Sequence, residues 1–493
     1  MIVSSRCLSF CFVVAALSHL SAVFAADTTP PNIVLIFADD LGYSDVGCFG
    51  AKDIRTPSID RLAKEGTRFT NFYVSQPVCT ASRASLMTGC YANRIGLAGA
   101  LNHTSKVGIH ADEVLLPELL RQRGYATAIF GKWHLGHRPE FSPLRHGFQE
   151  FRGIPYSNDN GPLHPVVKTI PSLPWIDGEK TTELDPDQSQ FTYRLTEYAI
   201  QFMERHRDQP FFLYVPLIMP HVPIFASKKF QGKSGRGLYG DVVEELDWSV
   251  DTIFDALSWL GLQDNTLVIF TSDNGPFLSY GEHAGSATPF REGKLTTFEG
   301  GVRTPCVMWW PKHIPAGRTC DELVASIDLL PTIAKLAGAE LPKHPIDGLD
   351  VWPILSGQPD AKSPHESLLF YSGDELQAIR SGDWKLHFAH DYLTVAGPPG
   401  RAGNPANFEK MQPKSIEESG IRSIASRHGY EVRHIEQSLF NLNNDPGEAR
   451  NVAMQNPDVV RRLEALAEKA RADLGDSLTN RRGSGIRMAG RVD

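Results

Sequence analysis

Short apolar runs alternate with stretches of helical periodicity through the first two-thirds of the chain, and this pattern constrains the fold most. Runs rich in Ile, Val and Phe predict buried strands at residues 32–38, 126–130, 211–217 and 267–271. Between them, residues 115–123 and 241–260 show the apolar spacing that is typical of helices. The alternation predicts an α/β sheet covered by helices on both faces.

The pattern changes after about residue 355, and 493 residues are enough for two domains. Residues 378–380 and 384–388 predict a hairpin. Residues 395–429 predict a long irregular excursion of the chain, and residues 457–474 predict an amphipathic helix. We therefore expect a large α/β domain at 27–360, a C-terminal α+β subdomain at 361–480, and a loose tail at 481–493.

The N-terminus has the layout of a signal peptide at residues 1–25. Arg6 precedes an apolar stretch at 7–17, and Val23-Phe24-Ala25 offers a cleavage site. A buried first helix is the alternative. No later run is apolar enough for a bilayer, so we expect no stable membrane insertion. The chain should be exported to a periplasm, the exterior or a lysosome-like lumen. A net charge of −8 without a basic block argues against nucleic acid as a partner.

Loss of that signal would leave five cysteines: Cys48, Cys79, Cys90, Cys306 and Cys320. An odd number in an exported protein leaves at least one thiol for another purpose. Cys306 and Cys320 could close a loop, but the spacing does not establish a pairing.

Carboxylates follow two of the predicted strands. Asp39 and Asp40 come directly after the strand at 32–38, and Asp273 and Asn274 follow the strand at 267–271. Adjacent carboxylates repel each other unless a cation or hydrogen-bond donors compensate. Together these groups form an all-oxygen set that suits Ca²⁺ or Mg²⁺. Either pair by itself could also be an ordinary turn or helix cap.

Basic and imidazole side chains follow other predicted strands. Lys132 and His134 come after 126–130, on the same side if that strand continues, and His221 comes after 211–217. Lys294 lies in a glycine-dense segment at 293–303. Taken singly, each is as well explained as a solvated lysine or a packed histidine. Taken together, they suit the binding of a sulfate ester.

Residues 79–89 read Cys-Thr-Ala-Ser-Arg-Ala-Ser-Leu-Met-Thr-Gly, with Arg83 one helical turn beyond Cys79. This segment resembles the sulfatase signature, whose cysteine is oxidised to formylglycine. A cysteine thiolate attacking a sulfate ester would form a thiosulfate adduct with no evident route for release. The formylglycine hydrate that the resemblance implies carries two geminal hydroxyls, so one can attack sulfur and the other can later expel sulfate. The ordinary alternative is a buried cysteine beside a surface arginine.

The resemblance to the sulfatase signature extends beyond this segment. Gly-Lys-Trp-His-Leu-Gly, Pro-His-Val-Pro, Ser-Asp-Asn-Gly-Pro and Gly-Lys-x-x-x-x-Glu-Gly-Gly-Val-Arg follow it in order. Over about residues 30–450 the chain is identified as a member of the formylglycine-dependent, arylsulfatase A-like family of the alkaline phosphatase superfamily.

The resemblance implies an alkaline-phosphatase-like, mainly parallel sheet and a smaller C-terminal domain with an antiparallel sheet. It also implies hydrolysis of aryl or carbohydrate sulfate monoesters to an alcohol and inorganic sulfate through a sulfoenzyme intermediate. Sulfated small molecules or glycans would be substrates, and a formylglycine-generating enzyme would be a partner.

The resemblance implies a role for each matched residue. Arg83 would hold the hydrate and His134 would orient it, while Ser157 would add a hydrogen bond. His221 would protonate the leaving oxygen or bind sulfate. The remaining assignments are Lys132 and Lys294 as the sulfate clamp, and Asp39, Asp40, Asp273, Asn274 and the converted Cys79 as ligands of Ca²⁺ in preference to Mg²⁺, with Asp273 also accepting a proton.

Three features depart from the family pattern. Ala81 stands where Pro or Ser is common, Cys90 stands where Arg is common, and residues 395–429 have no counterpart that we can match. The alternative functions are a phosphatase or phosphodiesterase of the same superfamily and a non-catalytic sulfated-glycan-binding protein. The phosphatases use Ser or Thr and two zinc ions held partly by histidine.

Overall fold

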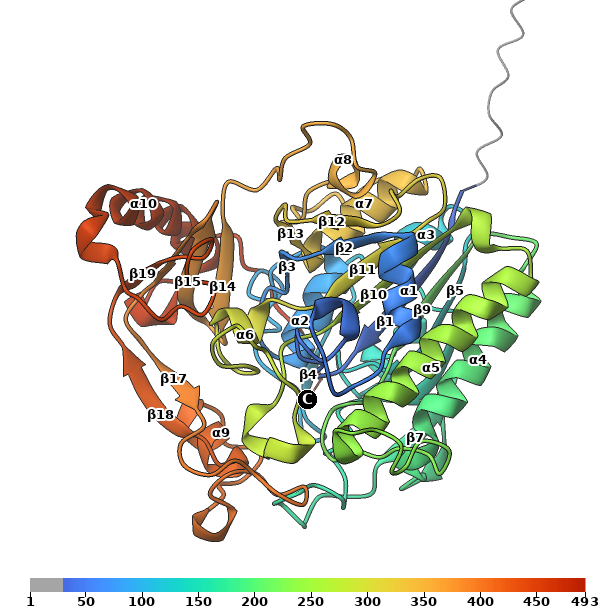
Figure 1. The fold of residues 1–493 in the computed structure, drawn as a ribbon, viewed down its shortest axis with the longest axis horizontal. Helices are drawn as coiled ribbons and strands as arrows, with labels where there is room; N and C mark the ends of the chain where they lie inside the picture. The colour runs from blue at the N-terminus through green and yellow to red at the C-terminus, as the bar shows by residue number, and fades with distance from the viewer. Residues whose placement is uncertain (1–29, 493) are drawn as a thin grey trace, which may run out of the picture.

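The computed structural model describes residues 30–492 (Figure 1). The predicted signal peptide at 1–25 lies outside the described residues. Within 30–492, no helix combines the length and the apolar character needed to cross a membrane.

A ten-stranded mixed sheet forms the centre of the fold, in the order β12-β2-β11-β10-β1-β9-β5-β6-β7-β8. Its middle five strands run parallel. They are β10 (Thr266–Ser272), β1 (Asn32–Ala38), β9 (Phe211–Pro216), β5 (Ala126–Lys132) and β6 (Glu150–Ile154). The four strands predicted from apolar runs are therefore confirmed, and together they form the centre of the sheet.

Short strands complete both edges of this sheet, and every pairing among them is antiparallel except the parallel pairing of the outermost two strands on one edge. One edge carries β11 (Cys306–Trp309), β2 (Thr67–Phe69) and β12 (Arg318–Cys320), and the other carries β7 (Pro174–Asp177) and β8 (Lys180–Leu184). Cys306 and Cys320 both pair with Phe69, so β2 separates them. The Cys306–Cys320 disulfide that the spacing left open therefore does not form, and all five cysteines of residues 30–492 are free thiols.

Both faces of the sheet are buried, as the continuous apolar runs require. Along β1, Val34 and Ile36 belong to one core, and Ile33, Leu35 and Phe37 belong to the other. Helices α1 (Pro57–Glu65), α4 (Phe191–Arg205) and α5 (Gly237–Trp259) cover the first face. Helices α2 (Cys79–Thr88), α3 (Leu116–Arg121) and α7 (Leu329–Leu336) cover the second. Full burial of each such apolar side chain contributes about 1.5–3 kcal/mol.

A second, antiparallel sheet follows in the chain. Its order is β14 (Leu368–Ser372), β15 (Glu375–Ser381), β16 (Trp384–His387) and β19 (Ser438–Asn441). Strands β15 and β16 form the predicted hairpin. Helix α10 (Pro457–Leu474) packs its apolar side on this sheet, with the predicted bounds. The short elements β3 (Phe72–Tyr73), β13 (Val324–Ala325), α6 (Glu299–Val302) and α8 (Trp352–Leu355) lie earlier in the chain.

The predicted excursion at 395–429 is confirmed. It connects the two strands of an antiparallel ribbon, β17 (His390–Thr394) and β18 (Glu431–Ile435). The one α-helix within it is α9 (Ile421–His428). In Figure 1 these orange elements lie apart from the four-stranded sheet. Helix α9 packs against both strands of the ribbon, and Ala425 and Tyr430 join the core of the large sheet.

The C-terminal tail is anchored, contrary to our expectation of a loose segment from 481. Strand β20 (Gly490–Arg491) pairs with β4 (Val107–Gly108). Arg487 forms an ion pair with the buried Glu113, with Nε 2.6 Å from Oε1. At least one of the arginines that suggested a solvated tail thus has an acidic partner far away in the sequence.

Candidate active site

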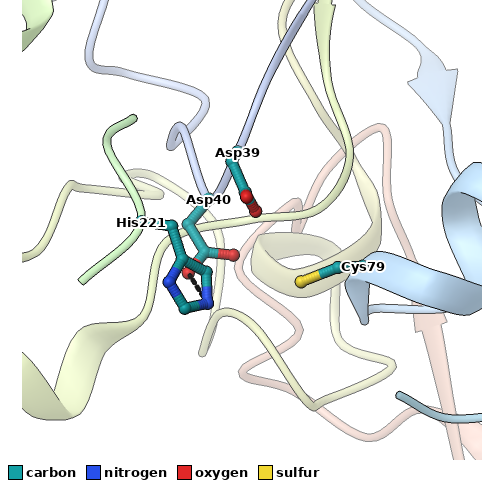
Figure 2. Close-up of side chains that lie close together, drawn as sticks. All are labelled: Asp39, Asp40, Cys79 and His221. Atoms are coloured by element: carbon teal, nitrogen blue, oxygen red, sulfur yellow. Dashed lines mark ion pairs between the residues drawn. The ribbon is translucent and has the colours of Figure 1, made fainter. Parts of the chain in front are cut away.

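The predicted site residues gather where the five parallel strands end. Because these strands are adjacent and parallel, the segments that follow them meet at one edge of the sheet. In Figure 2 the carboxylates of Asp39 and Asp40, the ring of His221 and the sulfur of Cys79 face a common space. Most of the predicted site residues lie at the end of a strand or shortly after it: Asp39 and Asp40 (β1), Lys132 and His134 (β5), Ser157 (β6), His221 (β9), and Asp273 and Asn274 (β10).

Cys79 is the first residue of α2, and that helix is buried along its whole length. Its many small side chains allow close packing inside the protein, and Gly89, with φ 67°, ends it in the left-handed conformation. The start of a helix favours negative charge, which suits a site for sulfate. Burial raises the pKa of the Cys79 thiol to about 12, so an unmodified Cys79 would be a protonated thiol at neutral pH.

Two cations hold the carboxylates of Asp39 and Asp273. Lys132 Nζ lies 2.6 Å from Asp39 Oδ2, and Arg83 Nη2 lies 2.7 Å from Asp273 Oδ2 and 3.4 Å from Asp39 Oδ2. The hydrogen bonds of the Arg83 side chain go to Asp273 and to the Lys132 carbonyl, and none goes to Cys79. In this structure Arg83 therefore orients the carboxylates.

Because of these contacts, the pKa values of the two carboxylates shift in opposite directions. Burial raises the pKa of Asp39, but Lys132 and Arg83 outweigh it and hold that pKa well below its usual range. Burial and the neighbouring charge of Asp39 raise the pKa of Asp273. Asp273 is therefore the carboxylate better suited to accept a proton.

Asp40 lies between Lys294, Asn274 and His221. Lys294 Nζ is 2.7 Å from Asp40 Oδ1, Asn274 Nδ2 donates to the same oxygen at 2.7 Å, and His221 Nε2 is 3.5 Å from Oδ2. Asp40 adopts a φ of 63°, which is uncommon for a residue with a side chain and is consistent with a functional constraint. Burial alone would lower the pKa of Lys294, but Asp40 and Cys79 raise it well above its usual value.

Two buried oxygen atoms in this cluster lack a hydrogen-bond partner. They are Oδ1 of Asp39 and Oδ1 of Asn274. An unpaired buried oxygen is costly, and a hard divalent cation would satisfy both atoms. One ligand atom each from Asp39, Asp40, Cys79 and His221 also lies within 4.8 Å of the others. The residues therefore fit a Ca²⁺- or Mg²⁺-type ion.

In each of the two histidines, a backbone carbonyl next to one ring nitrogen fixes the hydrogen-bonding role of that nitrogen. His134 Nε2 lies 2.8 Å from the Leu101 carbonyl and must donate to it, while the buried Nδ1 has no partner. Burial and Lys132 hold the pKa of His134 well below its usual value, so Nδ1 is a free acceptor. His221 Nδ1 lies 2.6 Å from the Val222 carbonyl, and its Nε2 lies 3.3 Å from Ser157 Oγ.

A cavity of about 710 Å³ opens above these groups. Cys79, His134, Ser157, His221 and Lys294 line its base. Its other walls include Asp159 and His164, Ser372 to Glu375 of the small sheet region, and residues 416–421, Arg427 and His428 of the excursion. Asp159, His164 and His428 were not among the predicted site residues. Of the three, only Asp159 could have been found from its position, because it lies two residues beyond Ser157 and follows the same strand.

Comparisons with known proteins found similar sequences and a similar fold. The sequence fits the sulfatase family model over residues 31–339 and the model of the C-terminal region of aryl-sulfatase over 363–484. It is 41% identical over 482 residues to arylsulfatase A from Bos taurus, covering 91% of this chain and 89% of that protein. It is 42% identical over 376 residues to N-acetylgalactosamine-6-sulfatase from Homo sapiens, covering 73% and 72%. The crystal structure of the PsFucS1 sulfatase from Pseudoalteromonas sp. matches with a TM-score of 0.77 at 28% identity, covering 90% of both chains.

Proposed function

The chain belongs to the sulfatase family and is a sulfuric ester hydrolase, and on this premise we propose that it works through a formylglycine made from Cys79 beside a bound Ca²⁺. The observation that carries the proposal is the position of Cys79. It begins a buried helix at the base of the cavity, with its sulfur 3.2 Å from Lys294 Nζ and among oxygen ligands. The substrate is a sulfate monoester of an aryl or carbohydrate alcohol.

Asp39, Asp40, Asp273 and Asn274, with the converted residue 79, would hold the ion. Their oxygens suit Ca²⁺ better than Mg²⁺, because Ca²⁺ accepts more protein ligands and a less regular geometry. When bound, the ion would offset the charge of three clustered carboxylates and polarise a sulfate oxygen. The unpartnered oxygens of Asp39 and Asn274 support this assignment.

Formylglycine supplies, as its hydrate, one hydroxyl that attacks sulfur and a second that later expels sulfate. Lys294, which lines the cavity, and Lys132, which lies behind it and is paired with Asp39, supply positive charge to the sulfate oxygens, where negative charge builds up. His134 accepts a hydrogen bond at Nδ1 from the hydrate and keeps it oriented. Asp273 takes the proton of the attacking hydroxyl, and Arg83 keeps Asp273 in position.

His221 faces the leaving alcohol. Because its Nδ1 is committed to the Val222 carbonyl, Nε2 is the nitrogen that serves the ester oxygen. Nε2 carries a proton only in the cationic ring, and in that state it protonates the leaving oxygen or binds sulfate. Ser157 Oγ, within hydrogen-bond distance of that nitrogen, helps to fix the ring.

The proposal includes the export of the chain and its conversion by a modifying enzyme. A signal peptide at residues 1–25 would export the chain to a periplasm, the exterior or a lysosome-like lumen, after conversion by a formylglycine-generating enzyme. A sulfated small molecule or glycan would meet it there.

The decisive experiment is mass spectrometry of the peptide containing residue 79, with sulfatase assays of the same preparation. We expect the aldehyde mass at residue 79 in the active protein, and loss of activity on replacement Cys79→Ala. Cys90→Ser is the matched control, since Cys90 is a second buried thiol just beyond α2, and it should keep its activity. Phosphate monoesters should be poor substrates. Full sulfatase activity with an unmodified thiol at residue 79 would overturn the proposal.

A further inference from the structure

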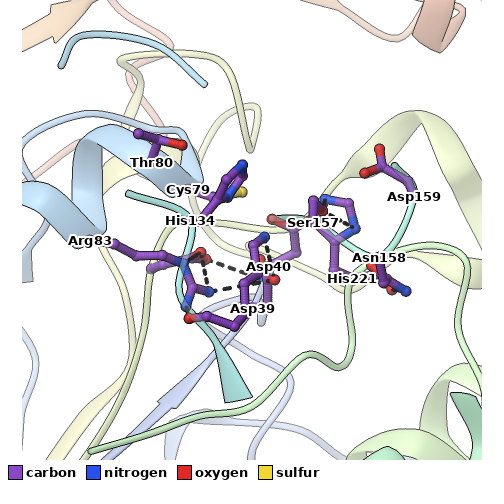
Figure 3. A network of polar contacts seen from close by, with 12 residues as sticks. Asp39, Asp40, Cys79, Thr80, Arg83, His134, Ser157, Asn158, Asp159 and His221 are labelled. Carbon is purple, nitrogen blue, oxygen red and sulfur yellow. Dashed lines mark hydrogen bonds and ion pairs between the residues drawn. The ribbon is translucent and has the colours of Figure 1, made fainter. Parts of the chain in front are cut away.

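Asp159 stands beside the catalytic groups without a cationic partner of its own. It lies two residues beyond Ser157, on the loop after β6, and Figure 3 shows it next to Ser157 and His221. Its carboxylate is half-buried and lines the cavity. Asn160 Nδ2 donates to it at 3.1 Å, and none of the ion pairs within residues 30–492 includes it. Such a carboxylate is a strong acceptor for a ligand.

Two neutral imidazoles, those of His164 and His428, line the same cavity as Asp159. His164 Nδ1 accepts the backbone N–H groups of Val166 and Val167 at 3.0 and 2.9 Å, so the proton is on Nε2, which is a donor. The ring of His428, from α9, lies 6.2 Å from that of His164, and its Nδ1 is 3.0 Å from the Tyr280 hydroxyl. Burial lowers the pKa of both histidines, so they offer hydrogen bonds without charge.

The buried part and the more exposed part of the cavity lining carry opposite charges. The base holds Lys294 and, behind it, Lys132 and Arg83. The one arginine of the outer wall, Arg427, donates through Nη1 to the carbonyls of Ser415 and Glu418. The carboxylates of the outer wall are Asp374, Glu375, Asp391, Glu417 and Glu418. One end therefore suits sulfate, and the other disfavours a second anion.

We propose that Asp159, with His164 and His428, forms a subsite that binds a hydroxyl group next to the ester oxygen of the leaving alcohol and disfavours an anion in that position. The proposal rests on the proposed sulfatase function and specifies its substrate class: a sugar or similar polyol that carries one sulfate, in preference to a densely sulfated chain. A hydroxyl can donate to Asp159 while it accepts from an imidazole N–H. A leaving group without it would leave Asp159 and the two imidazoles without that hydrogen-bond partner, and a carboxylate or second sulfate would meet Asp159 directly.

The test uses phenyl sulfates that differ only in the group ortho to the ester: hydroxyl, methoxy or carboxylate. For the wild type, we expect kcat/KM for the hydroxyl compound to exceed that for the methoxy compound about tenfold, the size of one hydrogen bond to a charged group. We expect the carboxylate compound to fall about another tenfold below methoxy, because of like-charge repulsion.

Three variants separate the contributions. Asp159→Asn keeps an acceptor but loses the charge, so the methoxy-to-carboxylate ratio should fall to within about twofold of unity. His428→Phe keeps ring packing on Phe277, whose centroid is 4.9 Å away, and should lower the hydroxyl preference alone. Asp208→Asn is the control, because Asp208 is 93% exposed and lies outside the cavity lining. Since every ratio is measured within one preparation, partial misfolding of a variant cancels.

The subsite is refuted if Asp159→Asn keeps both wild-type ratios while the enzyme hydrolyses unsubstituted phenyl sulfate. A wild-type protein with confirmed formylglycine that hydrolyses no sulfate ester at all would instead refute the proposed function, so the two failures can be told apart.

Discussion

The Nζ atom of Lys294 lies 2.7 Å from an oxygen of Asp40 and 3.2 Å from the sulfur of Cys79. This single ammonium group thus joins the carboxylate cluster to the position of the nucleophile. It comes from a loop beyond the sheet, whereas Asp40 follows β1 and Cys79 begins α2. The site therefore depends on three separate segments of the chain meeting at one point.

The first prediction concerns this ammonium group. Replacement Lys294→Met should lower kcat/KM for aryl sulfates by about 10²–10³-fold, because a preorganised donor to the developing charge is lost. Steady-state kinetics on protein with confirmed formylglycine provide the measurement. Lys362→Met is the control, because that lysine pairs with Glu322 at 2.8 Å while its side chain is 78% exposed. An equal effect in both variants would contradict the assignment of Lys294 to the sulfate site.

A second prediction concerns the ion. Added Ca²⁺ should raise the thermal midpoint of chelator-treated protein, since an ion at 100 times its Kd stabilises the folded state by about 2.7 kcal/mol. Asn274→Ala removes one of the two unpartnered oxygens and should weaken this shift. Calorimetry and measured calcium content give readouts besides activity. A wild-type midpoint that responds to neither chelator nor Ca²⁺ would contradict the metal site.

The central strands and the site edge were predictable from sequence for one physical reason. A strand buried on both faces must be apolar throughout, so β1 stands out, and a polar residue directly after it, such as Asp39, lies at the sheet edge. The grouping of Lys132 and His221 with it then follows from parallel strand order. Roles for individual residues came from the family resemblance.

Long-range partners left no such trace in the sequence. The tail looked solvated because the pairing of Arg487 with Glu113 spans most of the chain. His428 lies in an irregular excursion, so no periodicity placed it in the cavity wall. Close spacing suggested a link between Cys306 and Cys320, but β2 inserts between their strands.

A third prediction concerns a buried ion cluster where the two sheets meet. Lys385 of β16 lies 2.9 Å from Glu299 of α6 and 3.1 Å from Glu448, and all three side chains are fully buried. Lys385→Met should destabilise the fold by about 3–5 kcal/mol, because both buried carboxylates lose the ammonium group between them, although Glu299 keeps Arg303 at 3.4 Å. Chemical denaturation measures this. Lys312→Met is the control, since Lys312 pairs with Asp264 at the same 2.9 Å but at the surface, where such a pair contributes at most about 1 kcal/mol. Equal losses in both variants would contradict the prediction.

The last prediction concerns the pH dependence of the same cluster. Burial, and then the negative charge of Glu299, raise the pKa of Glu448 above its usual 4.5, although Lys385 opposes the shift. Between 4.5 and the raised value, the folded state binds more protons at this residue than the unfolded state does. The contribution of Glu448 to the free energy of unfolding is therefore complete below pH 4.5 and is lost as pH rises toward neutrality.

Glu448→Gln removes that titration but keeps an oxygen for the Glu299 backbone N–H, which donates to Glu448 at 2.6 Å. Other buried groups also titrate in this range, so the quantity to measure is the difference in unfolding free energy between variant and wild type at each pH. That difference should shift in favour of the variant from pH 4.5 to neutrality. Glu436→Gln, at a side chain that is 87% exposed, should show a constant difference. A difference for Glu448→Gln that does not change with pH would mean that Glu448 is ionised throughout, with Lys385 dominating its burial.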